Sequence, residues 1–338
     1  MKFLFKLLLL LLGLVGISSV AILAFYRWGS ASSFPPQRYA EIVTYRQSEP
    51  ALREIFTVVT YNIGYLSGLT NNQPLVRSRP RFEANQQTAL RALQEIAPDI
   101  ISFQEIDFGS KRSFQLDQAR AMAQGLGLGQ GAIAVNWDKN YVPFPYWPPT
   151  AQFGKVLSGQ AILSRYPIQK TSRIVLEKVE SKPAYYNAFY LDRLAQVALV
   201  ELDGRQIIII NVHLEAFDAP TRLSQTQVVR DLAEGYARDY PVLLMGDFNS
   251  AVNRPEEGRA SIQLIAQSPD FTPAVPIDQW GADSATFPSD QPQYKLDYIF
   301  YTPKTLEKID AQVVSTAQQA SDHLPLMMRF RFRDQAQK

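Results

Sequence analysis

The 338-residue sequence contains no cysteine and only two histidines. The absence of cysteine excludes thiolate metal sites, a cysteine nucleophile and disulfide bonds, and it fits either side of a membrane. A strong net charge is missing as well: the formal value is +2, and Lys2, Lys6 and Arg27 carry positive charge near the N-terminus. The rest of the chain is close to neutral, which argues against a grip on long nucleic acid through many phosphate contacts. The sequence also lacks a Gly-x-Ser-x-Gly nucleophile turn and a phosphate-binding loop.

A long uncharged apolar run lies near the N-terminus. No charged residue occurs from Leu7 to Phe25, and a stretch of about 20 such residues can cross a bilayer as a helix. We therefore expect residues 1–28 to form an uncleaved single-pass transmembrane anchor, with a cleaved signal peptide as the alternative. Lys2 and Lys6 precede the run, so the positive-inside rule places the rest of the chain on the extracytoplasmic side of the cell membrane.

Residues 29–53 are rich in serine, proline and charge, and are expected to be a linker. The folded body is predicted to span residues 54–333 as one domain. Apolar runs and apolar residues at helical spacing predict its strands and helices. The predicted helices are 82–97, 117–126 and 219–238, and the predicted strands are 55–62, 99–103, 158–163, 194–201, 206–212, 242–246, 296–301 and 324–332. This order predicts an α/β fold with two layers of sheet and helices outside.

One segment, 136–153, does not fit a regular element. It contains four prolines and many aromatic residues, among them Trp137, Tyr141, Tyr146 and Trp147. We predict a long aromatic loop beside a functional site. The alternative is that these rings cover the surface of the core.

The stretch from Val242 to Ser250 is a strong candidate for chemistry. A short apolar strand ends at Gly246, and Asp247 and Asn249 follow it. Residues two apart in an extended segment share a face, so the carboxylate and the amide are expected to point the same way. The alternative is that both side chains only cap a turn.

Other polar residues also occupy the ends of predicted strands. Each has an ordinary explanation as a turn cap, a surface ion pair or a structural histidine. Sites nevertheless gather at strand ends in α/β sheets, and an oxygen-rich cluster suits Mg²⁺ or Mn²⁺ better than zinc. Such a cluster, with an oriented water and a cation, has the parts needed to hydrolyse a phosphate ester. The residues are Asn62, Glu105, His213, Asp297, Asp322 and His323.

Seven short motifs occur in this order: Thr-Tyr-Asn-Ile (60–63), Phe-Gln-Glu (103–105), Gly-Gln-Ala-Ile-Leu-Ser-Arg-Tyr-Pro-Ile (159–168), Asn-Val-His-Leu (211–214), Gly-Asp-Phe-Asn (246–249), Leu-Asp-Tyr-Ile (296–299) and Ser-Asp-His-Leu-Pro (321–325). Together they resemble the endonuclease/exonuclease/phosphatase superfamily, which includes DNase I-like nucleases, neutral sphingomyelinases and inositol polyphosphate 5-phosphatases. The resemblance covers about residues 54–333. It implies a four-layer α/β sandwich, two mixed β-sheets flanked by helices, and metal-dependent hydrolysis of phosphoesters.

The resemblance also implies roles for individual residues. Glu105 is similar to the main metal ligand of the family, and Asn62 and Asp322 would lie close to the metal. Asp247 would orient or deprotonate the attacking water. Asn249 would help to hold water and phosphate.

Both histidines match positions of the family. His323, supported by Asp297, resembles the histidine that contacts the scissile phosphate. His213 resembles the second histidine of the DNase I-like and sphingomyelinase branches, and Asp138 is a guess for its carboxylate partner.

We therefore expect a monomeric, membrane-anchored phosphodiesterase that uses Mg²⁺, or Mn²⁺ in its place, on a phospholipid or another small phosphodiester. Asn211 and Arg193 are candidate substrate contacts, although a structural ion pair is an equal alternative for Arg193. The aromatic segment and the near-neutral body favour a lipid. A DNA or RNA nuclease of the same superfamily is the alternative and would need a basic groove. A binding module without activity is a third hypothesis.

Overall fold

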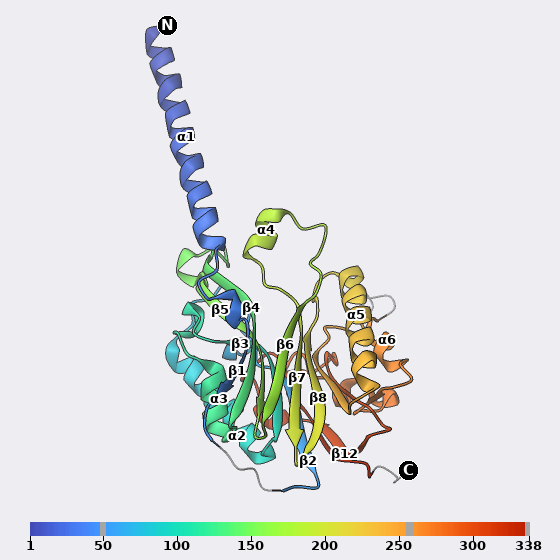
Figure 1. Cartoon of the computed structure of the whole chain (residues 1–338). Helices are drawn as coiled ribbons and strands as arrows, with labels where there is room; N and C mark the ends of the chain where they lie inside the picture. Colours follow the sequence, from blue (N-terminus) through green and yellow to red (C-terminus); the bar gives the residue numbers. More distant parts are fainter. Residues whose placement is uncertain (48–51, 255–259, 335–338) are drawn as a thin grey trace.

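A computed structural model describes residues 1–47, 52–254 and 260–334. It contains one long N-terminal helix, α1 (Lys2–Ser30), and a body built on two β-sheets. α1 projects from one end of the body (Figure 1), and its apolar side chains from Leu7 to Leu23 are exposed. Within the described part of the chain it is the one helix long and apolar enough to cross a membrane.

The first sheet has seven strands in the order β1-β4-β5-β3-β2-β13-β12, and the second has six in the order β10-β11-β9-β8-β7-β6. Both sheets are mixed, because β2–β3 and β8–β9 are parallel pairs among antiparallel ones. The strands of the first sheet are β1 (Ala40–Thr44), β2 (Phe56–Asn62), β3 (Ile100–Asp107), β4 (Gln130–Val142), β5 (Gly154–Ser164), β12 (Leu306–Val313) and β13 (Leu326–Phe332). Those of the second are β6 (Ile168–Val175), β7 (Leu194–Leu202), β8 (Arg205–His213), β9 (Val242–Asp247), β10 (Thr272–Pro273) and β11 (Asp297–Tyr301).

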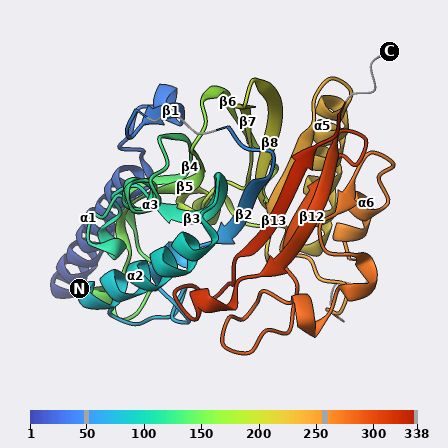
Figure 2. The ribbon, with the colours of Figure 1, turned by 90° about the horizontal axis from the view of Figure 1, so that it is seen from below.

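Helices cover the outer faces of the two sheets (Figure 2). α2 (Arg79–Ile96) and α3 (Gln118–Leu126) pack on the first sheet, and α5 (Ala219–Ala237) and α6 (Ile262–Ala266) lie on the side of the second. Strand β2 explains the layering, because its side chains alternate between faces. Val58 contributes to the core shared with the second sheet, whereas Val59 and Tyr61 pack in the core under α2 and α3. The predicted sandwich of two mixed sheets flanked by helices is therefore confirmed.

The aromatic segment 136–153 is only partly the irregular loop that its composition predicts. Its first residues, as far as Val142, continue strand β4 and pair with β5. The strand persists because Trp137 and Phe153 are buried and pack edge-to-face on each other, with the Arg112 guanidinium about 5 Å from each ring centroid. Tyr146 and Trp147, in contrast, are strongly exposed in the β4–β5 loop. Some rings of the segment therefore cover the core, as the alternative predicts, whereas the exposed rings lie in a shorter loop than expected.

The expected linker at 29–53 contains structure that its composition does not predict. Residues 40–44 form β1, which adds an edge strand to β4 through the pairing of Ala40 with Ala134 and Thr44 with Gln130. The backbone of β4 needs hydrogen-bond partners on both sides, and this segment supplies them. The Glu49-Pro50 part of the expected linker lies outside the described residues.

Lys295 is a cation buried in the body without a hydrogen bond among the described residues. Its Nζ lies 4.9 Å from the centroid of the Tyr298 ring, and the side chain is almost fully buried. Burial lowers the pKa of this ammonium to about 7, although Asp297 opposes the shift. The folded protein therefore carries the charge at a cost below pH 7.

We expect Lys295→Met to stabilise the fold at low pH. Between about pH 7 and the usual lysine pKa near 10.5, the unfolded chain binds more protons, so wild-type stability rises with pH across this window. Below pH 7 the wild type bears the full cost, and the variant should be more stable by roughly 3–5 kcal/mol. The gap should close by pH 10. Chemical denaturation at pH 6 and pH 10 measures it, with exposed Lys170→Met as the matched control. Equal stability at pH 6 would show that the Lys295 ammonium is well solvated in the folded protein.

Candidate active site

The candidate site forms where strands of both sheets end. In the first sheet β2 ends at Asn62, which pairs with Gln104 of the parallel strand β3. In the second sheet His213 ends β8 and pairs with Asp247 of the parallel strand β9. Asp297 begins the antiparallel strand β11 and pairs with Asp247 from the other side. The strand ends therefore bring residues from distant parts of the sequence to one edge of the sandwich.

Gly246 allows β9 to deliver Asp247 beside β8. Its φ is 146°, and a Cβ at this position would lie 2.1 Å from the carbonyl oxygen of Val212. A side chain cannot fit in that space, so the two strands could not pair closely here with any other residue. The glycine in the Gly-Asp-Phe-Asn motif is thus required by the backbone.

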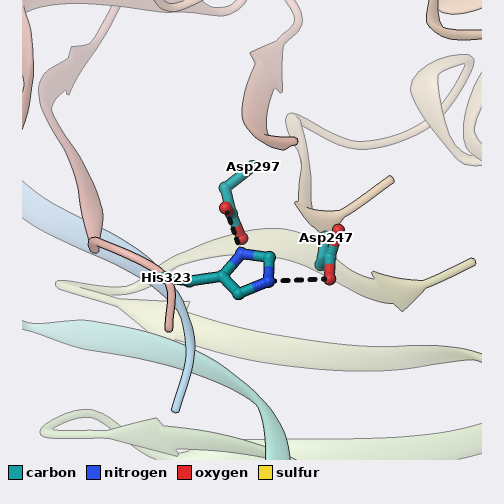
Figure 3. Close-up of side chains that lie close together, drawn as sticks. All are labelled: Asp247, Asp297 and His323. Atoms are coloured by element: carbon teal, nitrogen blue, oxygen red, sulfur yellow. Dashed lines mark hydrogen bonds and ion pairs between the residues drawn. The ribbon is translucent and has the colours of Figure 1, made fainter. Parts of the chain in front are cut away.

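His323, Asp297 and Asp247 form the centre of the site (Figure 3). The Nδ1 atom of His323 lies 2.9 Å from Oδ2 of Asp297, and its Nε2 lies 3.9 Å from Oδ2 of Asp247. All three side chains are buried. The Asp297 carboxylate therefore binds one nitrogen of the imidazole, and the other nitrogen points toward Asp247.

The electrostatics of this centre favour a charged His323. Burial lowers the pKa of the imidazole, but the carboxylates of Asp297 and Asp247 outweigh burial and raise this pKa to about 10. Burial raises the pKa of Asp247, and the nearby imidazolium opposes that rise. The His323–Asp297 pair therefore places a positive charge beside the buried carboxylate of Asp247.

Two amides hold Asp247 in place. Asn62 donates from Nδ2 to Oδ2 of Asp247 at 2.9 Å, and its own Oδ1 accepts from the backbone N–H of Gly64. The backbone N–H of Asn249 donates to Oδ1 of Asp247 at 2.9 Å. The Asn249 side chain donates to the carbonyl of Leu214 and, at 3.3 Å, to Oδ2 of Asp247. Asn62 and Asn249 therefore lie beside Asp247, as the motifs predict, and Asn62 orients the carboxylate.

Glu105 and Asp322 form a second acidic group in the site. The amide nitrogen of Asn71 lies 2.8 Å from Oε2 of Glu105 and 3.4 Å from both carboxylate oxygens of Asp322. Burial raises the pKa of Asp322 to about 6, with His323 opposing the shift and Glu105 adding to it. Glu105 has a positive φ of 50°, at an irregularity in the pairing of β3 with β5. Such strained backbone is uncommon and re-aims a side chain from the regular strand direction.

His213 is paired with a cation rather than with a carboxylate. Nη1 of Arg193 lies 2.6 Å from Nε2 of His213, so the histidine accepts a hydrogen bond there and carries its proton on Nδ1. Burial, then Arg193 and then His323, lower the pKa of His213 well below its usual range. Nε2 also lies 3.7 Å from Glu105 and 3.6 Å from Asp247. His213 is therefore a neutral residue in the middle of the site.

The guess that Asp138 is the carboxylate partner of His213 is wrong. Asp138 accepts hydrogen bonds from the backbone N–H groups of Ser33 and Phe34 and from the Tyr39 hydroxyl. Because strand β4 continues through this position, the Asp138 side chain binds the segment that follows α1. The Nδ1 atom of His213 is buried without a hydrogen-bond partner among the described residues.

Arg193 and Asn211 differ in their placement. Arg193 contacts His213 directly, and its Nε lies 3.5 Å from Oε2 of Glu215, so it is an ion-paired residue inside the site. Asn211 is fully buried between the sheets, where it donates to the Phe103 carbonyl and accepts from Gln104. Both ends of its amide make hydrogen bonds there, and Asn211 lies two residues before His213 on β8. These contacts give no support to a role in substrate binding.

Two residues of the site were not expected from the sequence, Asn71 and Glu215. Asn71 follows a strand end by several residues, in a loop with no recognisable motif. Glu215 lies two residues after His213, and this spacing was a usable signal, since Asp247 and Asn249 are related in the same way.

The donor set fits a divalent cation at Glu105 and Asp322. Carboxylates outnumber cations in the site, and the single charge of His323 is already shared by Asp297 and Asp247. Glu105 and Asp322 converge on one amide with no cation between them, and carboxylate and amide oxygens are the ligands of hard divalent ions. Asp247, Asp297 and His323 also offer ligand atoms within 4.8 Å of one another. A protonated imidazole has no free lone pair, however, so the first pair is the better candidate.

The two-sheet sandwich gives the chain a phosphoesterase fold, with this cluster at its edge. A sequence model described as the endonuclease/exonuclease/phosphatase family matches residues 59–323, and the chain belongs to this family. Members of the superfamily are hydrolases that act on phosphoester bonds, and they often depend on a divalent metal.

Relatives and solved structures agree with this assignment. A UPF0294 protein of Vibrio cholerae is 32% identical over 137 residues, a match that covers 38% of this chain and 41% of that protein. An endonuclease/exonuclease/phosphatase from Beutenbergia cavernae superimposes with a TM-score of 0.62 at 19% identity, covering 83% of this chain and 72% of that chain. The catalytic domain of human Nocturnin with bound sulfate gives a TM-score of 0.56 at 20% identity, covering 89% and 100%. At such identities the two structures establish the fold alone.

Proposed function

We propose that this protein is a membrane-anchored, Mg²⁺-dependent phosphodiesterase that acts outside the cytoplasm on a phospholipid or another small phosphodiester. The observation that carries the proposal is the His323–Asp297 pair beside Asp247. One side of the site thereby holds a fixed cation for the phosphate, and the other holds a buried base for water. A monomer has all of these residues in one chain.

The residues of the chain have distinct parts in hydrolysis. Asp247, held by Asn62 and Asn249, is placed to orient a water and accept its proton. The imidazolium of His323 stabilises the negative charge that develops on the phosphate oxygens, and Asp297 keeps it charged. A bound divalent cation at Glu105 and Asp322 would supply further charge neutralisation on the phosphate.

Arg193 is a further candidate contact for phosphate. Its guanidinium is buried at 5% exposure and lines a pocket next to the site, together with Glu215, Tyr186 and Tyr190. Arginine binds phosphate oxygens through its planar fork of donors, and here it would exchange its contact with His213 for one with the substrate.

The lysines at the start of α1 support an extracytoplasmic body. Lys2 and Lys6 lie at the N-terminal end of the helix, and the positive-inside rule places that end in the cytoplasm. Protease accessibility in sealed cells tests this topology, because the body is digested from outside only in the proposed orientation.

Metal removal is the primary test of the activity. The full chain in detergent is expected to hydrolyse bis-p-nitrophenyl phosphate with Mg²⁺ or Mn²⁺ and to lose this activity in EDTA. Glu105→Gln keeps the shape of the side chain but removes its charge, so we expect the half-saturating Mg²⁺ concentration to rise by about 10–100-fold. Glu307→Gln, on the surface strand β12, is the matched control and should behave as the wild type. Turnover that persists in EDTA would overturn the metal-dependent mechanism. A blank result with this diester and with lipids, DNA and inositol phosphates would favour a binding module.

A further inference from the structure

The end of α1 is attached directly to the body without a free linker. Asn140 donates from its side chain to the carbonyl of Trp28 and from its backbone to that of Ala31, and Lys139 donates to the carbonyl of Ser30. Gly29 is buried at this junction, where a Cβ would lie 3.2 Å from the ring of Phe189 and 3.3 Å from a backbone oxygen. The helix and the body are therefore held in one orientation.

The junction and the candidate site lie at the same end of the first sheet. β3 and β4 run in the same direction, since both are antiparallel to β5. Ser158 of β5 pairs with Asp107 of β3 on one side and with Trp137 of β4 on the other. Ile106 of β3 and Val135 of β4 both pair with Gly159, so Glu105 lies near the level of Ala134 and Val135. Asn140, which binds α1, is five residues beyond Val135, about 17 Å further along the strand at 3.3 Å per residue.

The connection between β6 and β7 joins the same junction to the pocket beside the site. Its short helix α4 (Ala184–Phe189) lies next to the base of α1 (Figure 1). Phe189 packs on Phe25 and Tyr26 of α1, and its carbonyl accepts a hydrogen bond from the Trp137 indole. Tyr186, on the same short helix, lines the pocket that contains Arg193. One wall of the pocket is therefore built on the segment that contacts α1.

Exposed aromatic residues surround this junction, and we call Trp28, Tyr146, Trp147 and Tyr185 the aromatic rim. Their exposures are 55%, 73%, 77% and 66%. Trp28 packs on Tyr141, whose hydroxyl binds Gln152, and Gln152 reaches the carbonyl of Tyr146. The rim residues come from α1, the β4–β5 loop and α4. Tryptophan and tyrosine prefer the headgroup layer of a bilayer, because one part of the side chain is apolar and the other is polar.

We propose that the aromatic rim lies in the headgroup layer of the membrane that α1 crosses, and that the pocket beside His213 takes its phosphodiester from a phospholipid of that same membrane. This inference rests on the proposed phosphodiesterase function and selects its substrate class. The junction fixes the height of the site relative to the helix, about 17 Å along β4 from the residue that binds the end of α1. Phe217, which is 84% exposed and also lines the pocket, provides apolar surface for the lipid part.

The position of the rim can be measured directly, because the chain has no cysteine and any introduced cysteine is unique. We would label Trp147→Cys and Tyr185→Cys with an environment-sensitive NBD dye in full-length protein reconstituted into phosphatidylethanolamine/phosphatidylglycerol vesicles. Headgroup-spin-labelled lipid should quench both probes at least threefold more than a probe at Lys170→Cys. Lys170 is exposed on β6 and pairs with Leu199, far along β7 from the Arg193 end. Equal quenching at all three positions would overturn the membrane contact.

The substrate class is tested by comparing two substrates in the same vesicles. The Tyr146→Ser/Trp147→Ser double variant changes only exposed loop residues, so it should hydrolyse soluble bis-p-nitrophenyl phosphate at the wild-type rate. Its release of headgroups from vesicle phospholipid should fall about tenfold or more. Wild-type protein that cleaves the soluble diester and leaves phospholipid intact would overturn the lipid substrate. Failure of the wild type on both substrates would instead contradict the phosphodiesterase function, and the quenching result would still decide the position of the rim.

Discussion

Asp247→Asn is expected to reduce kcat/KM on any phosphodiester substrate by about 10³-fold or more, because a positioned general base typically contributes 10²–10⁴-fold. The substitution is nearly isosteric, but asparagine keeps only one acceptor oxygen, so it can accept from Asn62 or from the Asn249 backbone and not from both. What it removes is the ability to accept a proton from water. Since burial raises the pKa of Asp247, its ionised form costs folding energy. The loss of one hydrogen bond opposes this gain, so the variant should keep a stability close to that of the wild type.

Parallel measurements of activity and thermal unfolding separate these two effects. Asp310→Asn, at a carboxylate paired with Arg329 on the surface, is the matched control and should keep full activity. A loss of activity smaller than tenfold in Asp247→Asn would exclude Asp247 as the base. A large drop in unfolding temperature would show instead that the carboxylate is structural.

Asp297→Asn is expected to change the pH dependence of the reaction as well as its rate. With Asp297 present, the pKa of His323 lies near 10, so the imidazolium is retained through pH 9. Without the Asp297 carboxylate, fewer negative charges oppose the effect of burial on the imidazole. The pKa of His323 should then fall toward or below the usual histidine value near 6.5. The charged form then disappears as the pH rises. We expect activity to be reduced about tenfold at pH 6 and at least 10²-fold at pH 8, since each pH unit above the lowered pKa costs tenfold.

The coupling between the two residues gives a second readout. If Asp297 acts through His323, then Asp297→Asn combined with His323→Gln should be little worse than His323→Gln alone. Profiles of kcat/KM from pH 5 to 9 for the wild type and the three variants make this comparison. A parallel profile for wild type and Asp297→Asn, or additive losses in the double variant, would contradict the role of Asp297 in keeping His323 charged.

Much of the site could be predicted because it follows from strand patterns. Asn62, His213 and Asp247 end apolar strands, and neighbouring parallel strands in a sheet end at the same edge. Asn249 lies beside Asp247 as predicted, but through a turn rather than an extended chain, since its φ is 50° and its backbone N–H donates to Asp247 Oδ1. These are local features, so their consequences could be derived without knowing the fold in detail.

Other features required the three-dimensional arrangement. No pattern predicts that Arg193 would be placed on Nε2 of His213, or that Asp138 would bind the segment after α1 rather than this histidine. Asn71 reaches Glu105 and Asp322 from an irregular loop. Side-chain pairing of this kind depends on which strands are neighbours and on where loops return, and both are long-range properties of the chain.

The sequence by itself determined the two-sheet sandwich, the apolar N-terminal helix and the strand ends that carry the acids and histidines, because apolar periodicity and turn residues act over a few positions. The tertiary structure decided the charge state of each histidine, since neighbours from other strands set it: Asp297 keeps His323 charged, whereas Arg193 and burial keep His213 neutral. It also decided that residues after α1 join the body through β1 and Asn140. Composition predicted a linker here. The segment is ordered instead because the backbone at the edge of β4 gains hydrogen bonds from β1, and the carbonyls at the end of α1 gain hydrogen bonds from β4.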